Sequence, residues 1–543
     1  MSLNYNRTLV EVFSESCQTF ADNNAFTCMD RTLSYADLDR LSGRFAAYLQ
    51  QHTTLKPGDR IAVQLPNVLQ YPVVIFGAMR AGMIVVNTNP LYTAHEVKHQ
   101  LIDSGAKALV VLANIAKNAA AIIRDTSVEQ VIVTELADLH SPLKRILLNF
   151  AVRHLKKMVP PFEFPQQIAF NKALSLATKP WQPVAQTPDD VAVLQYTGGT
   201  TGVAKGAMLT HRNLVANMVQ LNERMKDIFR PSQEFYVAPL PLYHIYSFTI
   251  HCTSAMTMGN HSLLIPNPRD IPGFVKTLQG KPFTFFVGLN TLFNALLRNP
   301  DFRQLDFGSL RLTCSGGMAL TAETNKNWME LTKAPISEGY GLTETSPVVS
   351  NNPIGNVQQG TVGLPLIDTN CKVIDDAGNE LPAGEAGELC VQGPQVMKGY
   401  WQRPDATAEV MDAEGWFKTG DIAIIQADGF IKIVDRKKDM INVSGFKVFP
   451  NEVEDALSGH PDIVEVAVIG VPDGDGSETV KAFIVTANEQ LTIAEVRKFA
   501  KETLTAYKVP HLIEFRKELP KTNVGKILRR ELRDQELAKV KNA

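Results

Sequence analysis

The sequence predicts an α/β protein with largely parallel sheets, divided into more than one domain. Short β-branched runs, at residues 60–66, 83–89, 108–113 and 130–135, alternate with helical stretches such as 38–51. This alternation is typical of strand–helix–strand units. The chain has 543 residues, which is too long for one compact core, so two to four domains are expected.

From about residue 360 the pattern changes to short strands that follow one another directly. Residues 371–393 and 421–439 contain such strands with turn signals between them. They predict a β-rich subdomain over about 355–437, at the end of a large N-terminal domain that spans 1–437.

The last part of the chain, residues 438–543, has a compact α+β pattern of its own. Its expected elements are helix 451–458, strand 465–471, strand 480–486 and helix 493–504. We expect a small C-terminal domain here, joined to the large domain near residue 438.

Charge and cysteine usage restrict the class of protein. The formal net charge of −2 gives no argument for nucleic-acid binding. The six cysteines (17, 28, 252, 314, 371 and 390) are scattered and form no C-x-x-C pair. This indicates reduced, mostly buried thiols in a cytoplasmic protein. The most apolar stretch, 108–123, is too short and too polar to span a bilayer.

One basic segment, residues 142–158, contains five lysines and arginines and no acidic residue. On a helical wheel Leu143, Leu147 and Phe150 share a face, and Arg145 and Arg153 lie opposite. Two interpretations stay open. The helix lies on an anionic membrane surface, which would place the protein peripherally at the inner face of the cell membrane, or its apolar face docks on the protein's own core.

The stretch "YTGGTTGVAKGAMLTHRN", residues 196–213, predicts an anion cradle. Its glycines allow tight turns with exposed N–H groups, its threonines add hydroxyl donors, and Lys205 adds a positive charge. It is not a P-loop, because Gly206 rather than serine or threonine follows Lys205. The residues after the loop predict a short strand, followed by a helix with Thr210 as its N-cap. The cradle is therefore a strand–loop–strand device.

Five blocks in order carry a family resemblance: residues 196–213, 338–347, 415–423, 435–454 and 520–530. They resemble the adenylate-forming superfamily of acyl-CoA ligases, peptide-synthetase adenylation domains and beetle luciferases, over nearly the whole chain. "NTNPLYTAHEV", "PLPLYHIYS" and "GWFKTGDIAIIQADGFIKIVDRKKD" are most similar to bacterial long-chain fatty-acyl-CoA ligases.

The resemblance implies a two-step reaction that uses ATP, Mg²⁺ and coenzyme A. A fatty-acid carboxylate attacks the α-phosphate of ATP to give acyl-AMP and pyrophosphate, and the thiol of coenzyme A then displaces AMP. An anion must approach a polyanion in the first step, so positive charge placed where charge develops should supply most of the catalysis.

The resemblance also assigns the nucleotide site. The β- and γ-phosphates would be cradled by Thr197, Gly198, Gly199, Thr200, Thr201, Gly202 and Lys205. Tyr340 would stack on adenine, Thr343 would bind the phosphates, and Glu344 would hold Mg²⁺. The rest of the nucleotide pocket would comprise Gly316, Gly317, Glu338, Gly339, Gly341, the ribose acceptor Asp421, and Arg436.

Further roles are implied for the two half-reactions. Lys526 would neutralise charge between the carboxylate and the α-phosphate. Lys438 would be the hinge about which the small domain rotates. Ser444, Gly445 and Phe446 would then line the coenzyme A tunnel, and His244 would lie between the acyl site and the thiol channel. The apolar run 284–297 would line the acyl tunnel.

Structural alternatives stay open for several of these residues: core packing for Tyr340, His244 and 284–297, and solvated charge for Glu344 and Lys526. For Arg436 the alternative is a surface salt bridge, and for Gly316 and Gly317 it is a tight strand-end turn. Functional alternatives also remain. One is a ligase for medium-chain or aryl acids, one an enzyme that passes acyl-AMP to a carrier protein, and one a degenerate lipid-binding scaffold. The sequence also leaves a homodimer open.

Overall fold

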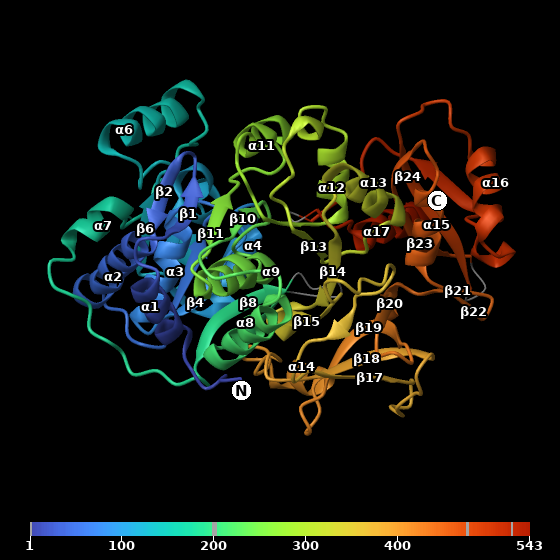
Figure 1. Cartoon of the computed structure of the whole chain (residues 1–543), viewed down its shortest axis with the longest axis horizontal. Coiled ribbons are helices and arrows are strands. Elements are labelled where there is room, and N and C mark those ends of the chain that lie inside the picture. The colour runs from blue at the N-terminus through green and yellow to red at the C-terminus, as the bar shows by residue number, and fades with distance from the viewer. Residues whose placement is uncertain (1–2, 198–203, 474–476, 523–524, 543) are drawn as a thin grey trace.

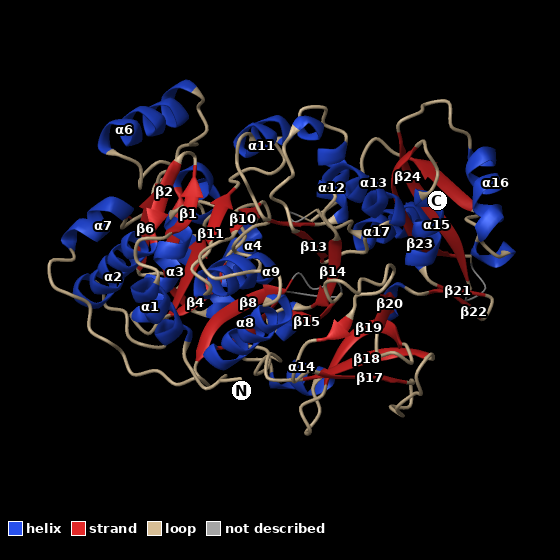
Figure 2. Cartoon of the chain, in the orientation of Figure 1, coloured by secondary structure: helices blue, strands red, loops and turns tan. Residues whose placement is uncertain are grey.

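We analysed a computed structural model of the chain, in which residues 3–197, 204–473, 477–522 and 525–542 are described (Figure 1). Two large sheets fill the N-terminal part of the molecule. A smaller sheet lies below them in the view, and the C-terminal elements pack at the right-hand end. The elements are mixed helices and strands throughout (Figure 2), as the alternating pattern predicts.

Within the described residues, the first large sheet has seven strands. In spatial order these are β7 (Ile168–Ala169), β6 (Gln130–Thr134), β5 (Ala106–Leu112), β3 (Arg60–Gln64), β4 (Ile84–Asn87), β8 (Val191–Thr197) and β9 (Lys205–Thr210). Every neighbouring pair is parallel except β8 and β9, which pair antiparallel across the anion-cradle loop. The expected strand–loop–strand arrangement is therefore present.

The second large sheet has nine described strands. They are β16 (Leu364–Pro365), β15 (Val348–Asn351), β14 (Ile336–Gly341), β13 (Leu312–Gly316), β12 (Phe285–Gly288), β10 (Phe235–Ala238), β11 (His261–Leu264), β1 (Asn24–Cys28) and β2 (Arg31–Ser34). The central strands are parallel, so their carboxyl ends meet at one edge. Antiparallel strands occupy both margins.

Helices pack around these two sheets (Figure 1). They are α1 (Leu9–Thr19), α2 (Tyr35–His52), α3 (Gln70–Arg80), α4 (Ala94–Ser104), α5 (Ala116–Ala120), α6 (Pro142–Phe150), α7 (Phe170–Leu176), α8 (His211–Met225), α9 (Ile245–Ser247), α10 (Ala255–Thr257), α11 (Ile271–Leu278), α12 (Asn290–Leu297) and α13 (Ala322–Thr332). π-Helical turns η3 (Ala151–Leu155) and η4 (Phe248–Ser254) continue α6 and α9. Thr210 caps α8 as predicted, since its side chain accepts a hydrogen bond from Asn213 N.

The β-rich region is a four-stranded antiparallel sheet. Its strands are β17 (Asn370–Ile374), β18 (Ala386–Gln392), β19 (Phe417–Ile425) and β20 (Ile431–Arg436), with α14 (Pro404–Val410) beside them. The 3₁₀ turn η7 (Lys437–Asp439) follows β20 directly. The polypeptide thus enters the C-terminal elements from the end of an ordered strand.

The C-terminal elements form their own α+β layer. They are β21 (Ile441–Val443), β22 (Phe446–Val448), α15 (Pro450–Ser458), β23 (Ile463–Pro472), β24 (Glu478–Thr486), α16 (Ile493–Thr503), β25 (Leu512–Phe515) and α17 (Arg529–Asn542). Strands β23, β24 and β25 form one sheet, and a separate cluster of buried side chains packs this sheet against α15 and α16. The boundary at residue 438 stays a prediction.

The apolar run 284–297 mostly packs in the core and lines the cavity only in part. Phe286 and Phe293 are fully buried in an aromatic cluster around Trp328, at ring-centroid distances of 5.4 and 4.7 Å from it. Mainly polar residues of α12, such as Asn290 and Asn294, line a large cavity between the sheets and the C-terminal elements instead. Core packing, the structural alternative, therefore explains most of this apolar pattern.

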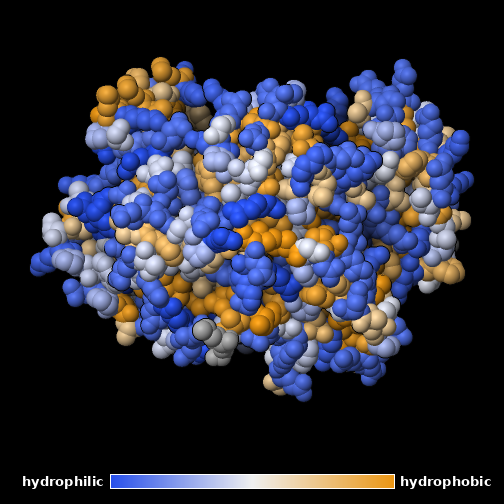
Figure 3. All heavy atoms as spheres, viewed as in Figure 1, coloured by the Kyte–Doolittle hydropathy of each residue, from blue (hydrophilic) through white to orange (hydrophobic). Residues whose placement is uncertain are grey.

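Of the two interpretations of residues 142–158, the one in which the apolar face docks on the core is wrong. Leu143, Ile146, Leu147, Phe150 and Leu155 are 56 to 72% exposed, and α6 has no buried residue. Figure 3 shows these apolar side chains gathered on the protruding upper-left corner of the molecule, where Figure 1 places α6. The described residues contain no helix with the length and apolar character needed to cross a bilayer.

Candidate active site

Most of the predicted site residues that the structure describes meet at a cavity of about 2380 Å³ between the large sheets, the β-rich sheet and the C-terminal elements. Thr197, Gly316 and Gly341 are the last residues of β8, β13 and β14. In open α/β sheets, ligands bind outside the carboxyl ends of the parallel strands, because the loops there diverge and leave a crevice. Strand topology thus explains why residues far apart in sequence converge here.

The anion cradle flanks this cavity. Gly198, Gly199, Thr200, Thr201 and Gly202 lie outside the described residues. Thr197 and Lys205 on either side of them are register partners and line the cavity. The Lys205 Nζ atom lies 4.8 Å from the centroid of the Tyr400 ring, in a cation–π contact.

Glu344 is in the turn η6 (Thr343–Thr345), and its carboxylate accepts a hydrogen bond of 2.7 Å from the Tyr400 hydroxyl. Burial raises the pKa of Glu344, and the Tyr400 hydrogen bond opposes that rise. The carboxylate is partly buried and bonded, so the solvated alternative for Glu344 is wrong. Thr343 lines the cavity beside it.

Sequence analysis missed Tyr400, whose ring contacts Lys205 and whose hydroxyl donates to Glu344. Trp401 N donates to Gly206 O at 2.8 Å, and Tyr400 itself bridges to Ala207, so this segment adds to the edge of β9. Met397 N donates to Glu344 O at 2.8 Å. The sequence "MKGYW" carries no local signal for this role, because the contacts are made through space.

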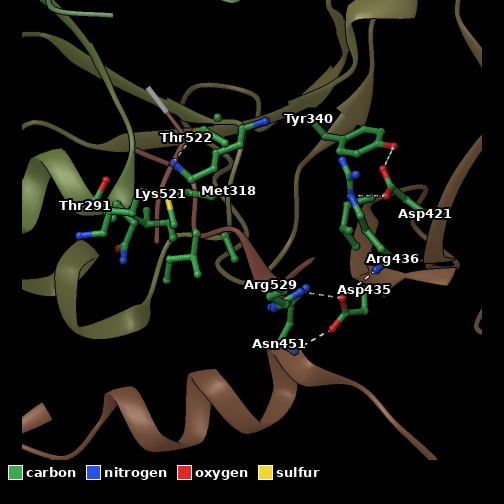
Figure 4. Close-up of a pocket in the computed structure, with 18 of the residues that line it drawn as sticks. Thr291, Met318, Tyr340, Asp421, Asp435, Arg436, Asn451, Lys521, Thr522 and Arg529 are labelled. Carbon is green, nitrogen blue, oxygen red and sulfur yellow. Dashed lines mark hydrogen bonds and ion pairs between the residues drawn. The ribbon is translucent and has the colours of Figure 1, made fainter. Parts of the chain in front are cut away.

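Tyr340, Asp421 and Arg436 form one connected group on the cavity wall (Figure 4). The Tyr340 hydroxyl donates to Asp421 Oδ2 at 2.6 Å, and Arg436 Nε lies 3.4 Å from Asp421 Oδ1. Asp421 and Arg436 are register partners on β19 and β20, which explains their proximity. Burial raises the pKa of Asp421, while Arg436 and Tyr340 oppose the rise.

Lys526 reaches the same cavity from the C-terminal elements. A Cβ on Gly317, whose φ is +84°, would lie 3.0 Å from Lys526 Cε, so a glycine is required where this side chain passes. The pKa of Lys526 is lowered to about 8, first by burial and then by Arg436, while Asp421 and Glu344 oppose the change. Solvated surface charge is therefore wrong for Lys526.

Gly316 meets a different neighbour. A Cβ there would lie 3.2 Å from the Tyr246 ring, and a side chain would narrow the cavity. Glu338, the third residue of β14, accepts a hydrogen bond from Leu320 N at 3.2 Å, and burial raises its pKa to about 7. Glu338, Gly339 and Gly341 all line the cavity.

His244 lies at the cavity wall, where its Nδ1 accepts from Tyr246 N at 3.3 Å. Burial, and to a lesser degree Lys526, lowers its pKa to about 3, so the ring is neutral at ordinary pH. Buried Asn67 braces the preceding loop, since its amide donates to Ala238 O and Leu240 O and accepts from Leu242 N. His244 is thus held in place as an uncharged cavity residue.

The structure does not bring every predicted residue to the cavity. Ser444, Gly445 and Phe446 form the exposed tip between β21 and β22, away from the residues that line it. The Phe446 ring stacks on Tyr507 at 5.0 Å between centroids. Lys438 lies at the cavity edge, and its pKa is lowered to about 8 by burial and by Arg436.

The charged side chains that line the cavity include the cations Lys205, Arg436 and Lys526 and the carboxylates Glu344 and Asp421. Cations fixed around a partly dehydrated cavity can stabilise concentrated negative charge, such as that of phosphates.

Comparisons with known proteins identify the family of the chain. A family profile described as AMP-binding enzyme matches residues 13–401, and the AMP-binding enzyme C-terminal domain matches residues 452–526. The chain is 51% identical over 538 residues to the long-chain-fatty-acid–CoA ligase of Escherichia coli O6:H1, covering 99% of this chain and 96% of the relative.

Two solved structures show the same fold. The anthranilate CoA ligase AuaEII in complex with anthranoyl-AMP matches with a TM-score of 0.87 at 25% identity, over 99% of both chains. ATP-bound MatB from Rhodopseudomonas palustris matches with a TM-score of 0.81 at 29% identity, over 97% of this chain and 98% of the other. The family profile, the near full-length identity and the shared fold together show that this chain belongs to the AMP-binding enzyme family.

Proposed function

We propose that the chain is an ATP-dependent long-chain fatty acid–CoA ligase that forms acyl-AMP and pyrophosphate, then acyl-CoA and AMP. Family members of this kind use ATP, Mg²⁺ and coenzyme A. The observation that carries the proposal is the entry of Lys526 into the cavity that already holds Lys205, Glu344 and Asp421. The 51% identical relative supports the acid class.

In the first step Lys526 offsets the repulsion between the fatty-acid carboxylate and the α-phosphate. Lys205 and the residues from Thr197 to Gly202 hold the outer phosphates, and Arg436, which lines the same cavity, adds positive charge. These groups act by electrostatic stabilisation, because their charges are already placed before the reaction begins. Asp421 accepts from the ribose hydroxyls, and Tyr340 stacks on the base, with Gly316, Gly317, Glu338, Gly339 and Gly341 completing the pocket.

Glu344 would hold the Mg²⁺ ion, and Thr343 beside it would bind the phosphates. A carboxylate is an oxygen donor, and Mg²⁺ prefers one or two carboxylates together with phosphate oxygens, so Glu344 fits the ion. When bound, the ion supplies positive charge that offsets the charge of the phosphates. Tyr400 orients the Glu344 carboxylate toward the cavity.

The second step requires a different lining for the thiol. The small domain would rotate about Lys438 and bring Ser444, Gly445 and Phe446 to the tunnel. All three residues are exposed on the β21–β22 tip, and the Phe446 ring would exchange its stacking on Tyr507 for a place in the tunnel. His244 separates the acyl end from the thiol entrance as a neutral side chain, and no general-base role is needed.

The experiment that tests this function is AMP formation from ATP, coenzyme A and fatty acids of graded length. The highest kcat/KM is expected for long chains, because each methylene that is buried contributes about 0.8 kcal/mol. A maximum at medium-chain or aryl acids would identify one of those ligases instead. Acyl-AMP without free acyl-CoA would indicate delivery to a carrier protein, and no pyrophosphate with any acid would indicate a lipid-binding scaffold.

We also propose that residues 142–158 contact an anionic membrane. Polar groups hold this helix to the molecule: Arg153 donates twice to Glu135 Oε1, at 3.0 and 2.6 Å, and Asn149 Oδ1 accepts from Ala137 N at 2.9 Å. Lys144 donates to Met29 O at 3.2 Å. The usual arrangement of a surface helix is inverted, because its polar side faces the protein and its apolar side faces outward.

The chemistry of the outward side fits a lipid surface. Five exposed apolar side chains form a row along this side and can be buried in the headgroup region: Leu143, Ile146, Leu147, Phe150 and Leu155. Exposed Lys156 and Lys157 add positive charge at the end of this apolar row. Stable peripheral binding takes two such signals together, and each cation near an anionic surface contributes about 1 kcal/mol. A water-insoluble acyl substrate would be met at the same surface.

Vesicle co-sedimentation tests this contact. Wild-type protein should bind phosphatidylglycerol vesicles more strongly than phosphatidylcholine vesicles, and Leu147→Ser with Phe150→Ser should abolish the binding. Ile102→Ser, which changes an exposed apolar residue on α4, is the matched control. If the double variant binds vesicles like wild type, the contact lies elsewhere. If it instead converts a dimer to a monomer, the row is an interface between two copies.

A further inference from the structure

Asp435 is a buried carboxylate at the end of β20 whose hydrogen bonds cross to the C-terminal elements. Only 1% of the Asp435 surface is exposed. Oδ2 accepts from Asn451 N at 2.7 Å, and Oδ1 accepts from Arg529 Nη1 at 3.1 Å (Figure 4). Oδ1 also accepts from Arg436 N at 2.8 Å. Asp435 precedes residue 438, whereas both Asn451 and Arg529 follow it.

Arg529 is anchored firmly within the C-terminal elements themselves. Its guanidinium donates to Glu454 Oε1 at 2.9 Å and Oε2 at 2.5 Å, contacts Asn451 Oδ1, and lies 3.6 Å from Asp439 Oδ2. Among the contacts that the structure gives Arg529 in its described residues, the bond to Asp435 alone reaches across residue 438. Asp435 therefore sets where this anchored guanidinium, and the segment attached to it, lies against the large domain.

The attached segment carries Lys526, three residues before Arg529. Lys526 N donates to Thr522 Oγ1 at 3.1 Å, Thr522 N donates to Lys526 O at 2.7 Å, and Leu528 N donates to Pro520 O at 2.8 Å. These bonds tie residues 520–522 to residues 526–528. Because Lys526 lies in this bonded segment three residues before Arg529, a shift at Arg529 is expected to move Lys526.

We propose that Asp435 is a positioning residue for acyl-AMP formation, which holds Arg529 so that Lys526 stays in the cavity. This inference rests on the proposed function. A buried ion pair adds little to stability, because the cost of dehydrating both charges offsets their attraction, but it specifies one geometry. Misplacing a catalytic group by about 1 Å can cost about a hundredfold in rate.

Asp435→Asn is the sharpest test, because it keeps the shape and removes the charge. Arg529 stays neutralised by Glu454 and Asp439, so the C-terminal elements keep their own ion pairs. Acyl-AMP formation from ATP and fatty acid without coenzyme A should fall about tenfold, the loss expected for one charged hydrogen bond. Thioester formation from supplied acyl-AMP should stay near the wild-type rate.

The control is Glu452→Gln, which removes the 2.6 Å ion pair with Lys508 inside the C-terminal elements. It should leave both half-reactions unchanged. Equal loss of both half-reactions in Asp435→Asn, or no loss in either, would overturn the proposal. The first result would mark Asp435 as merely structural and the second as dispensable.

A distance measurement gives a readout that does not depend on catalysis. Fluorophores on Asp405→Cys and Lys501→Cys, two exposed positions on opposite sides of residue 438, report how the C-terminal elements sit. Asp435→Asn should broaden the energy-transfer distribution, and an unchanged distribution would overturn the positioning role. Absence of pyrophosphate release by the wild type would refute the proposed ligase and leave this measurement valid.

Discussion

The charge on Lys526 predicts how acyl-AMP formation depends on pH. Its pKa is about 8, because burial and the charge of Arg436 disfavour the ammonium, while Asp421 and Glu344 oppose part of that change. His244, which also feels Lys526, is neutral in this range because its pKa is about 3. A lysine loses its charge as pH rises through its pKa, so the rate should fall on the alkaline side.

The size of the effect follows from the pKa. With a value of about 8, about 90% of the enzyme carries the ammonium at pH 7, about half at pH 8 and about 10% at pH 9. The free enzyme governs kcat/KM, and the structure describes the enzyme without ligand. We therefore expect kcat/KM for ATP to fall about tenfold between pH 7 and pH 9.

The assay is pyrophosphate release without coenzyme A, so that titration of the thiol cannot contribute. Lys526→Arg keeps a positive charge at every accessible pH and should be slower but independent of pH over this range. Lys517→Met, at an exposed position on the same segment, is the control and should follow the wild-type profile. A flat wild-type profile to pH 9, or the same decline in Lys526→Arg, would refute the role of the Lys526 charge.

Three further predictions test the site and the core. Tyr400→Phe removes the hydroxyl that orients Glu344, so pyrophosphate release should need about 10- to 100-fold more Mg²⁺, as measured by Mg²⁺ titration; an unchanged requirement would separate Tyr400 from the metal site. Lys438→Pro should trap one pose, so that only one half-reaction survives when each is assayed alone, and normal rates in both would exclude a hinge there. Thr313→Val leaves the buried Trp328 indole N–H without its 3.0 Å acceptor, so denaturant unfolding should show a loss of about 1–3 kcal/mol with activity retained, and unchanged stability would contradict that bond's contribution.

Much of the candidate site was predictable because its signals are short and local. The glycine- and threonine-rich loop, the β-strand that follows it and the Thr210 cap depend on neighbouring residues alone. The same is true of the alternating strands and helices. Matches in five ordered blocks then placed Lys205, Glu344 and Lys526 in one site before any distance was known.

The sequence by itself therefore determined the α/β class, the strand–loop–strand cradle and the family resemblance. Only the tertiary structure decided which side of α6 faces outward. A helical wheel shows a polar and an apolar face, but it does not show that Glu135 of the large domain is placed to bind Arg153 on the polar face. Tyr400 meets Glu344 across 56 residues, and Asp435 meets Arg529 across 94. Such partners are set by how the sheets and the C-terminal elements pack in space, and no local pattern encodes that packing.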